Sequence, residues 1–296
     1  MLIDLSWVLN PSTGLSLTAI VGIAFILGVL HGLTPDEHTW PITFSYSIGS
    51  YSTRGGMKAG FTFSLGFTLQ RALLTTLGFI GAAAIYKTYN LDGPVYIVVG
   101  AVMFVAGYYV LRGRYLHLPI DTLLGRKHHT GEAERFPMHE ATNPVPLKMA
   151  AVHGLIAGWG FGAYASIITF ILAPQVPSLI YAPLPGLAFG IGTMCMQIML
   201  GSVFATVMHA KHLTIEQMKK IGRTTAGRAL YYGGVAFAAI GALIILFPTL
   251  DAVGLSTGVP IPNVNVIGVS TVLVVSVVGV IGFGSMYRAY KEVVST

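Results

Sequence analysis

Four ionisable side chains lie within eight positions at the end of a long apolar run. They are His31, Asp36, Glu37 and His38, in the stretch GVLHGLTPDEHTWP. Ionisable groups at membrane depth are energetically costly, and they usually face a substrate pathway, a partner or a bound ion. Imidazole combined with carboxylate is ligand chemistry that suits nickel, cobalt, zinc and copper(II). The cluster therefore predicts a binding site for a divalent transition metal ion.

The spacing of the two histidines requires a break in the helix that carries them. His31 and His38 are seven positions apart, so a continuous helix would place them on one face, about 10 Å apart. One metal ion with bonds of about 2.1 Å to each nitrogen does not bridge that distance. Gly32 and Pro35 supply the break. We therefore expect the element over about 15–50 to be a kinked or broken helix.

Five further polar residues lie in or beside the apolar runs and are candidates for the site or its pathway. We expect His153 to complete the metal site, with a packed core histidine as the alternative. Arg71 lies near the middle of the second run. We expect Arg71 to pair with Asp36 or Glu37 in the empty state and to release that acid when a cation binds. The alternative is a permanent structural ion pair. Thr34, Gln70 and Gln197 are candidates for lining the pathway.

The composition indicates a helical membrane protein. The chain has 296 residues, of which 54% are hydrophobic and 9% charged, whereas soluble domains carry about 25% charged residues. The single cysteine, Cys195, excludes an intrachain disulfide and a two-cysteine redox relay. The net charge of +6 does not indicate nucleic-acid binding, because the basic residues fall at the ends of the apolar runs. The lipid bilayer is the expected partner, and a homo-oligomer is left open.

The apolar runs predict about seven transmembrane helices. They cover roughly 15–34, 58–86, 94–111, 148–173, 185–208, 228–250 and 265–287. With seven spans, fifteen of the 17 lysines and arginines fall on one side, which the positive-inside rule makes cytoplasmic. We therefore expect a plasma-membrane protein with its N-terminus outside and its C-terminus in the cytoplasm. A tight hairpin within 15–50 would give an eighth span and move only the N-terminus.

Two parts of the chain resemble one another. Residues 27–33 read LGVLHGL and 149–155 read MAAVHGL, and a Phe-x-x-Gly segment that ends near a glutamine follows each, at 63–70 and 189–197. Because each copy has three spans, the two copies would lie inverted in the membrane. Inverted repeats with a substrate site on broken helices are typical of secondary transporters.

The expected fold is all-α, a 3+3 inverted repeat with one extra C-terminal helix. Its parts are a first repeat over 1–112, a cytoplasmic linker over 113–147, a second repeat over 148–250 and the extra span over 251–296. The linker contains four histidines, which indicate either a metal trap or a plain solvated tether. They are His117, His128, His129 and His139.

The cluster resembles the His-x4-Asp-His signature of the nickel/cobalt transporter family and its urease-accessory-like relatives, within the larger lysine-exporter-type superfamily. The segment 63–66, Phe-Ser-Leu-Gly, resembles the start of the family's Phe-x-Leu-Gly-His-Ser motif. This chain differs in having Glu37 inserted before His38 and Phe67 where the family has histidine. The resemblance covers the first two spans. It implies a kinked transmembrane helix that recognises Ni²⁺ or Co²⁺ for transport.

Three functions follow from these observations. The first is a permease for divalent transition metal ions, nickel or cobalt by resemblance, in which the ion is the substrate and no cofactor is expected. The second is a transporter of an anionic or amino-acid substrate that Arg71 would recognise. The third is a membrane-embedded metal-dependent enzyme. We do not expect an enzyme, because no second His-rich motif completes a set of metal ligands with an open water position.

Overall fold

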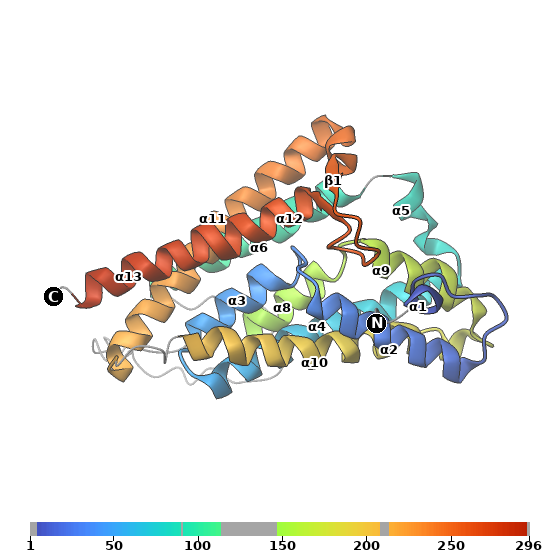
Figure 1. Ribbon diagram of the computed structural model, residues 1–296, viewed down its shortest axis with the longest axis horizontal. Coiled ribbons are helices and arrows are strands. Elements are labelled where there is room, and N and C mark those ends of the chain that lie inside the picture. Colours follow the sequence, from blue (N-terminus) through green and yellow to red (C-terminus); the bar gives the residue numbers. More distant parts are fainter. Residues whose placement is uncertain (1–4, 90, 114–146, 208–212, 295–296) are drawn as a thin grey trace, which may run out of the picture.

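The computed structural model describes residues 5–89, 91–113, 147–207 and 213–294, and this part of the chain is mostly helical (Figure 1). The α-helices are α1 (Ser6–Leu9), α2 (Leu17–Leu33), α3 (Trp40–Gly49), α4 (Thr53–Phe79), α5 (Ile85–Thr88), α6 (Asp92–Leu111), α8 (Leu147–Ala157), α9 (Ala163–Ser166), α10 (Leu184–Thr206), α11 (Ile215–Leu246), α12 (Val269–Val274) and α13 (Gly284–Val294). Two π-helical segments, Ile167–Leu172 and Val275–Phe283, continue α9 and α12. A small antiparallel hairpin of β1 (Gly254–Ser256) and β2 (Val266–Gly268) lies between α11 and α12.

Four helical stretches are long and apolar enough to cross a membrane. They are Asp92–Leu111, Leu179–Thr206, Ile215–Leu246 and Val269–Val294. Shorter apolar helices cover Leu17–Leu33, Leu147–Ala157 and Ala163–Gln175. Many large apolar side chains on these helices are exposed, which suits lipid better than water. The expectation of a helical membrane protein is therefore supported.

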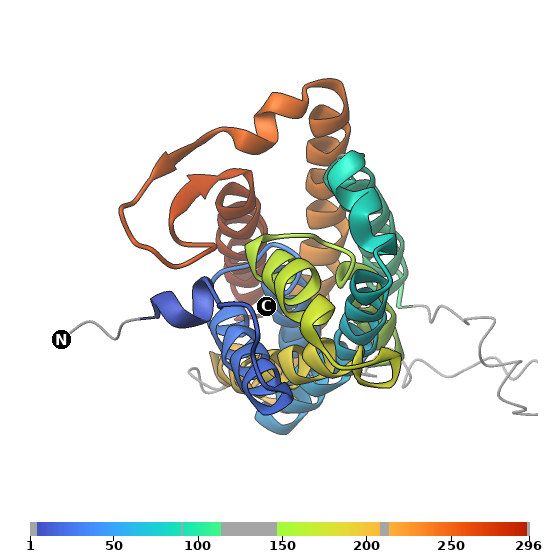
Figure 2. The same ribbon diagram turned by 90° about the vertical axis from the view of Figure 1, so that its right-hand side faces the viewer.

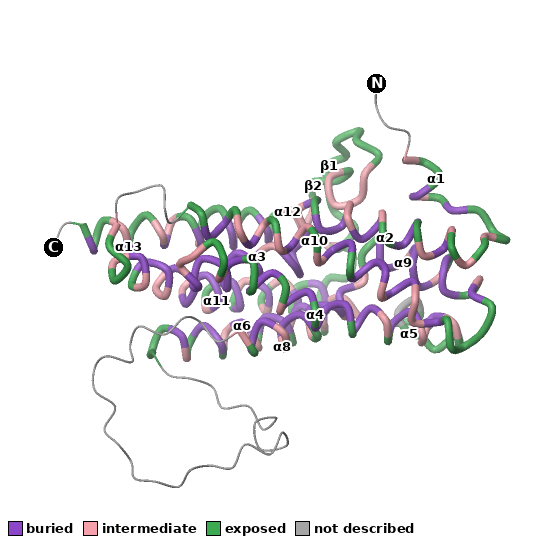
Figure 3. The backbone as a smooth tube through the Cα atoms, turned by 90° about the horizontal axis from the view of Figure 1, so that it is seen from below, coloured by how far each residue is buried: buried purple, intermediate pink, exposed green. Residues whose placement is uncertain are grey.

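The element predicted over 15–50 is broken, as its sequence requires. α2 ends before the connection 34–39, and α3 begins after it. Both helices follow α10 in the same direction, because Gly28 of α2 lies against Phe189 while Thr43 of α3 donates to Gln197 Oε1 at 2.6 Å. This course does not match a tight hairpin. α3 is buried along nearly its whole length (Figure 3).

The segment predicted as a span over 148–173 is interrupted too. α8 ends at Ala157, and the chain is non-helical across Gly158, Gly160 and Gly162 before α9 begins. Glycine lets two neighbouring elements approach closely here, because a Cβ at Gly160 would meet the ring of His38 at 2.7 Å. The interruption therefore places the backbone of this segment against the break between α2 and α3.

Two helices begin before their predicted boundaries, and one of them, α4, also ends at Phe79 rather than near residue 86. α11 begins at Ile215 rather than near residue 228, because Thr214 and Gln217 form a reciprocal capping box with bonds of 2.9 and 3.2 Å. α4 begins at Thr53, where the side chain of Ser52 accepts a hydrogen bond from a backbone N–H in the first turn. Hydropathy follows only the apolar part of such helices, so it does not predict their polar first turns.

Glycines bring α2, α4, α8 and α10 into backbone contact. A Cβ at Gly28 of α2 would collide with the carbonyl of Phe189 in α10, and a Cβ at Gly154 of α8 would collide with the carbonyl of Phe63 in α4. Small residues allow this close approach between membrane helices. Further pairs of the same kind are Gly192 against Phe25, Gly66 against Ala151, Gly60 against Gln197 and Gly186 against Arg71.

Candidate metal centre

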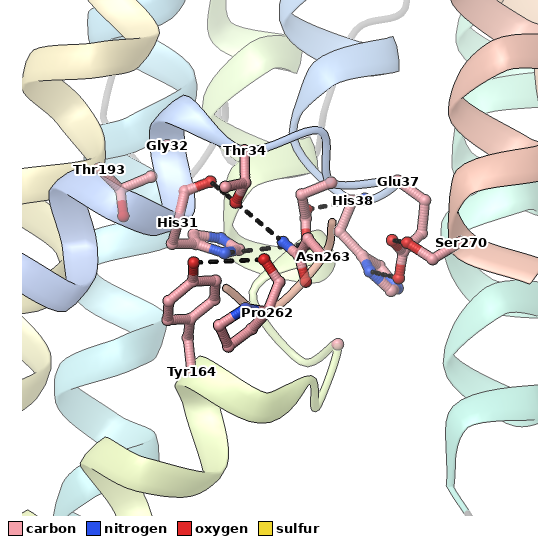
Figure 4. A network of polar contacts seen from close by, with 12 residues as sticks. His31, Gly32, Thr34, Glu37, His38, Tyr164, Thr193, Pro262, Asn263 and Ser270 are labelled. Atoms are coloured by element: carbon pink, nitrogen blue, oxygen red, sulfur yellow. Dashed lines mark hydrogen bonds and ion pairs between the residues drawn. The ribbon is translucent and has the colours of Figure 1, made fainter. Parts of the chain in front are cut away.

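The sequence-predicted cluster lies where α2 and α3 separate (Figure 4). His31 belongs to the last turn of α2, and Asp36, Glu37 and His38 belong to the connection. All four are buried, with 5–8% of each residue exposed. One ligand atom from each of Asp36, Glu37 and His38 lies within 4.8 Å of the others. His31 Nδ1 lies 3.8 Å from Asp36 Oδ2, so the structure brings all four predicted residues together.

Local hydrogen bonds explain how the connection folds. The backbone N–H and the hydroxyl of Thr34 both donate to the Leu30 carbonyl, at 3.0 and 2.9 Å, and so close the last turn of α2. The backbone N–H of His38 donates to Asp36 Oδ1 at 3.0 Å, the tight turn that aspartate favours. The chain therefore turns at Asp36, and His38 returns toward the carboxylates instead of continuing a helix.

The Glu37 carboxylate is surrounded by hydrogen-bonding groups. The Tyr96 hydroxyl donates to Oε1 at 2.9 Å, and the hydroxyl of Ser270 donates to Oε2. His38 Nδ1 lies 3.0 Å from Oε1, and its ring stacks on Tyr96. Carboxylates bonded in this way orient a metal-binding imidazole and fix which ring nitrogen faces the ion.

Three imidazole nitrogens of the cluster have no hydrogen-bond partner in the described part of the chain. They are both ring nitrogens of His31 and Nε2 of His38, and all three atoms are buried. The His31 ring lies among aromatic side chains, stacked on Phe67 at 5.6 Å and tilted against Phe189 at 5.1 Å. Phe67 stands where the resembling family has histidine, and here it forms a wall beside the first histidine.

A cavity of about 330 Å³ adjoins the cluster. Among the described residues that line it are four carboxylates, and Arg71 is the one lysine or arginine. The acidic residues are Asp36, Glu37, Asp92 and Asp251. Nη2 of Arg71 donates to the Gly160 carbonyl at 3.0 Å, and its guanidinium carbon lies 4.6 Å from the Phe67 ring centroid. The predicted pairing of Arg71 with an acid of the cluster stays a prediction.

Other predicted residues lie apart from the cavity. His153 is not among the described residues that line it, and its Nδ1 lies 2.7 Å from the Tyr46 hydroxyl and 3.0 Å from the Met149 carbonyl. Gln197 accepts from Thr43, as described above, and Gln70 is fully buried beside Gly158. Thr34 borders the cluster and accepts from Asn263 at 3.3 Å. The four linker histidines lie outside the described residues.

Sequence reasoning missed the residues that other parts of the chain bring to the cluster. Tyr96 is 59 positions from Glu37, and Ser270 is 233 positions from it. The segment that joins α11 to α12, which carries the β-hairpin (Figure 2), supplies Asp251 and Asn263, and the first turn of α12 supplies Ser270. The sequence offered a signal only for the acidic residues. Asp92 and Asp251 each adjoin an apolar run, at the ends where few lysines or arginines occur.

The arrangement offers nitrogen and carboxylate oxygen donors to a cation in a site removed from bulk water. Comparison with protein-family models, with curated proteins and with solved structures finds no match to this chain. The geometry of the site and the resemblance of its motif are therefore the two observations that indicate a function.

Proposed function

We propose that this protein is a membrane permease for divalent transition metal ions, nickel or cobalt by resemblance of its motif. The supporting observation is the buried group of imidazole nitrogens beside the Asp36 carboxylate, for which the described part of the chain provides no hydrogen-bond partner. A buried polar atom without a partner costs about 1–3 kcal/mol. A bound ion would supply that partner, and neutral imidazole is the form of histidine that binds metal.

In this proposal the four residues have two different tasks. His31, Asp36 and His38 bind the ion. Glu37 orients His38, because its carboxylate already receives the Tyr96 and Ser270 hydroxyls and lies 3.0 Å from His38 Nδ1.

The charges that line the cavity favour a cation over an anion. Four carboxylates outnumber one guanidinium among the described lining residues. Arg71 lines the same cavity, and its positive charge could recognise an anionic or amino-acid substrate. That transporter is the second candidate. Its recognition residue would be Arg71, and the acids would then have no part in binding.

The proposed architecture is seven crossings with an inverted repeat of three spans and one extra C-terminal span. The glycine contacts support a register in which positions 126 apart correspond, as Gly28 does to Gly154 and Phe189 to Phe63. In this register His153 corresponds to Leu27, one helical turn from the alignment that the His-Gly-Leu triplets suggest. Two such halves that move against each other would expose the site alternately to each side. The basic ends of the helices would then be cytoplasmic in the plasma membrane, with the N-terminus outside.

The experiment is metal flux into proteoliposomes, reported by an enclosed dye for Ni²⁺, Co²⁺, Zn²⁺, Mn²⁺, Cu²⁺ and Mg²⁺. We expect selective flux in the wild type and its loss in the double variant His31→Ala/His38→Ala. Arg71→Ala should retain the metal flux. Folded wild-type protein that moves none of these ions would contradict the proposal and favour the anionic substrate.

A further inference from the structure

Two acidic residues line the cavity beyond the proposed metal ligands. Asp92 is the first residue of α6, and Asp251 lies in the short turn Pro248–Ala252 after α11. Asp251 is exposed and Asp92 is half-buried, whereas the cluster is buried. Both acids line the same cavity as the cluster and are more exposed than it is, so they lie on the more open side of that cavity.

The ordinary explanation accounts for only one of the two acids. A carboxylate in the first turn of a helix is stabilised by the helix dipole, which applies to Asp92 in α6. Asp251 lies in a 3₁₀ helix of only 5 residues, which is too short to supply a comparable dipole. Partial burial at the cavity wall, and then the negative charge of Glu37, raise the pKa of the Asp251 carboxyl.

The gathering of like charges is unfavourable in the absence of a cation. Asp92, Asp251 and Glu37 all line one cavity, and Arg71 is the one lysine or arginine among its described lining residues. Independently, His31 and His38 line the same cavity, and within the described residues neither ring nitrogen of His31 nor Nε2 of His38 has a hydrogen-bond partner. The more exposed carboxylates and the buried imidazoles therefore offer a cation binding groups at two depths of one cavity.

We infer that Asp92 and Asp251 form an outer station that binds the hydrated divalent cation before it reaches the cluster. This inference rests on the proposed function. Oxygen donors that are partly in water hold a cation through its hydration shell, whereas the buried imidazoles replace that shell with nitrogen ligands. The outer station raises the local concentration of cations at the cavity and so acts on the half-saturation concentration rather than on the maximal rate.

The first test is Co²⁺ flux at low ionic strength with the double variant Asp92→Asn/Asp251→Asn. We expect the half-saturation concentration to rise about 3- to 10-fold with an unchanged maximal rate, and the difference to shrink in high salt. Asp92→Glu/Asp251→Glu keeps both charges and should stay close to the wild type. Glu216→Gln, which removes an exposed charge from α11, is the matched control and should change nothing.

A second test separates the outer station from the inner cluster without flux. Equilibrium dialysis measures Co²⁺ bound to purified His31→Ala/His38→Ala protein, with and without the two asparagine substitutions. We expect weak residual binding that these substitutions remove. Residual binding that is unchanged by them would overturn the outer station and leave the proposed function intact. Wild-type protein that neither binds nor transports Co²⁺ would overturn both.

Discussion

The substitution Glu37→Gln tests whether Glu37 orients a ligand or is itself a ligand. Glutamine keeps the shape of the side chain and one oxygen acceptor but removes the negative charge. The carboxylate meets three groups, the Tyr96 hydroxyl at 2.9 Å, His38 Nδ1 at 3.0 Å and the Ser270 hydroxyl. Loss of a carboxylate that supports a metal-binding histidine lowers metal affinity about 10- to 100-fold. This corresponds to about 1.4–2.8 kcal/mol, since each tenfold is about 1.4 kcal/mol.

The assay is a Co²⁺ titration of purified protein in detergent, followed by the visible absorption of the bound ion. We expect Glu37→Gln to bind Co²⁺ with affinity reduced by that factor and with the absorption of a nitrogen-ligated ion retained. His38→Ala should lose the affinity far more completely. Glu216→Gln is the charge-matched control, and thermal unfolding checks that each variant is folded.

Two results would refute this reasoning. Affinity equal to that of the wild type would mean that Glu37 neither binds the ion nor supports His38. A complete loss equal to that of His38→Ala, with an altered absorption spectrum, would make Glu37 a direct ligand, as the sequence alone suggests.

Three further predictions concern packing and the roles of single residues. Gly28→Ala should lower the free energy of unfolding by about 1–3 kcal/mol, because the new Cβ would collide with the Phe189 carbonyl. Gly22→Ala on the same helix is the control, since its Cβ meets nothing within 4 Å, and it should be neutral or stabilising. Thermal unfolding in detergent compares the two variants. His153→Ala should leave the Co²⁺ affinity within threefold of the wild type. It should destabilise the fold by about 1–3 kcal/mol, because the Tyr46 hydroxyl loses a buried hydrogen bond. A large loss of Co²⁺ affinity would instead place His153 in the metal site. Arg71→Ala should keep or tighten Co²⁺ binding in the same titration, and abolished binding would contradict a cation site.

The sequence was sufficient to locate the break and the cluster. Gly32 and Pro35 predict that the helix ends between His31 and His38, and the spacing of the histidines demands it if both face one ion. The structure places this break where expected and folds it through the Asp36 turn. These features are local, so a single stretch of sequence contains their physical cause.

The partners of the cluster were not predictable, because they depend on how distant helices pack. No periodicity in α6 distinguishes Tyr96 from its apolar neighbours, and nothing near Ser270 indicates that its hydroxyl reaches Glu37. The expectation for His153 depended on matching two His-Gly-Leu triplets. Backbone contacts at glycines follow a different register, which only the packed helices reveal.

The part of the chain from the end of α11 to the first turn of α12 contributes several groups to the wall of the cluster. Ser270 donates to Glu37, Asn263 donates to Thr34, and the Tyr164 hydroxyl donates to the carbonyl of Pro262 at 3.3 Å (Figure 4). Each bond joins the C-terminal part of the chain to the wall of the cluster. A site built only from residues 1–250 would lack a donor to Glu37 and one side of its cavity. Residues 251–270 are therefore a structural part of the candidate metal centre, because they supply groups that the connection between α2 and α3 does not contain.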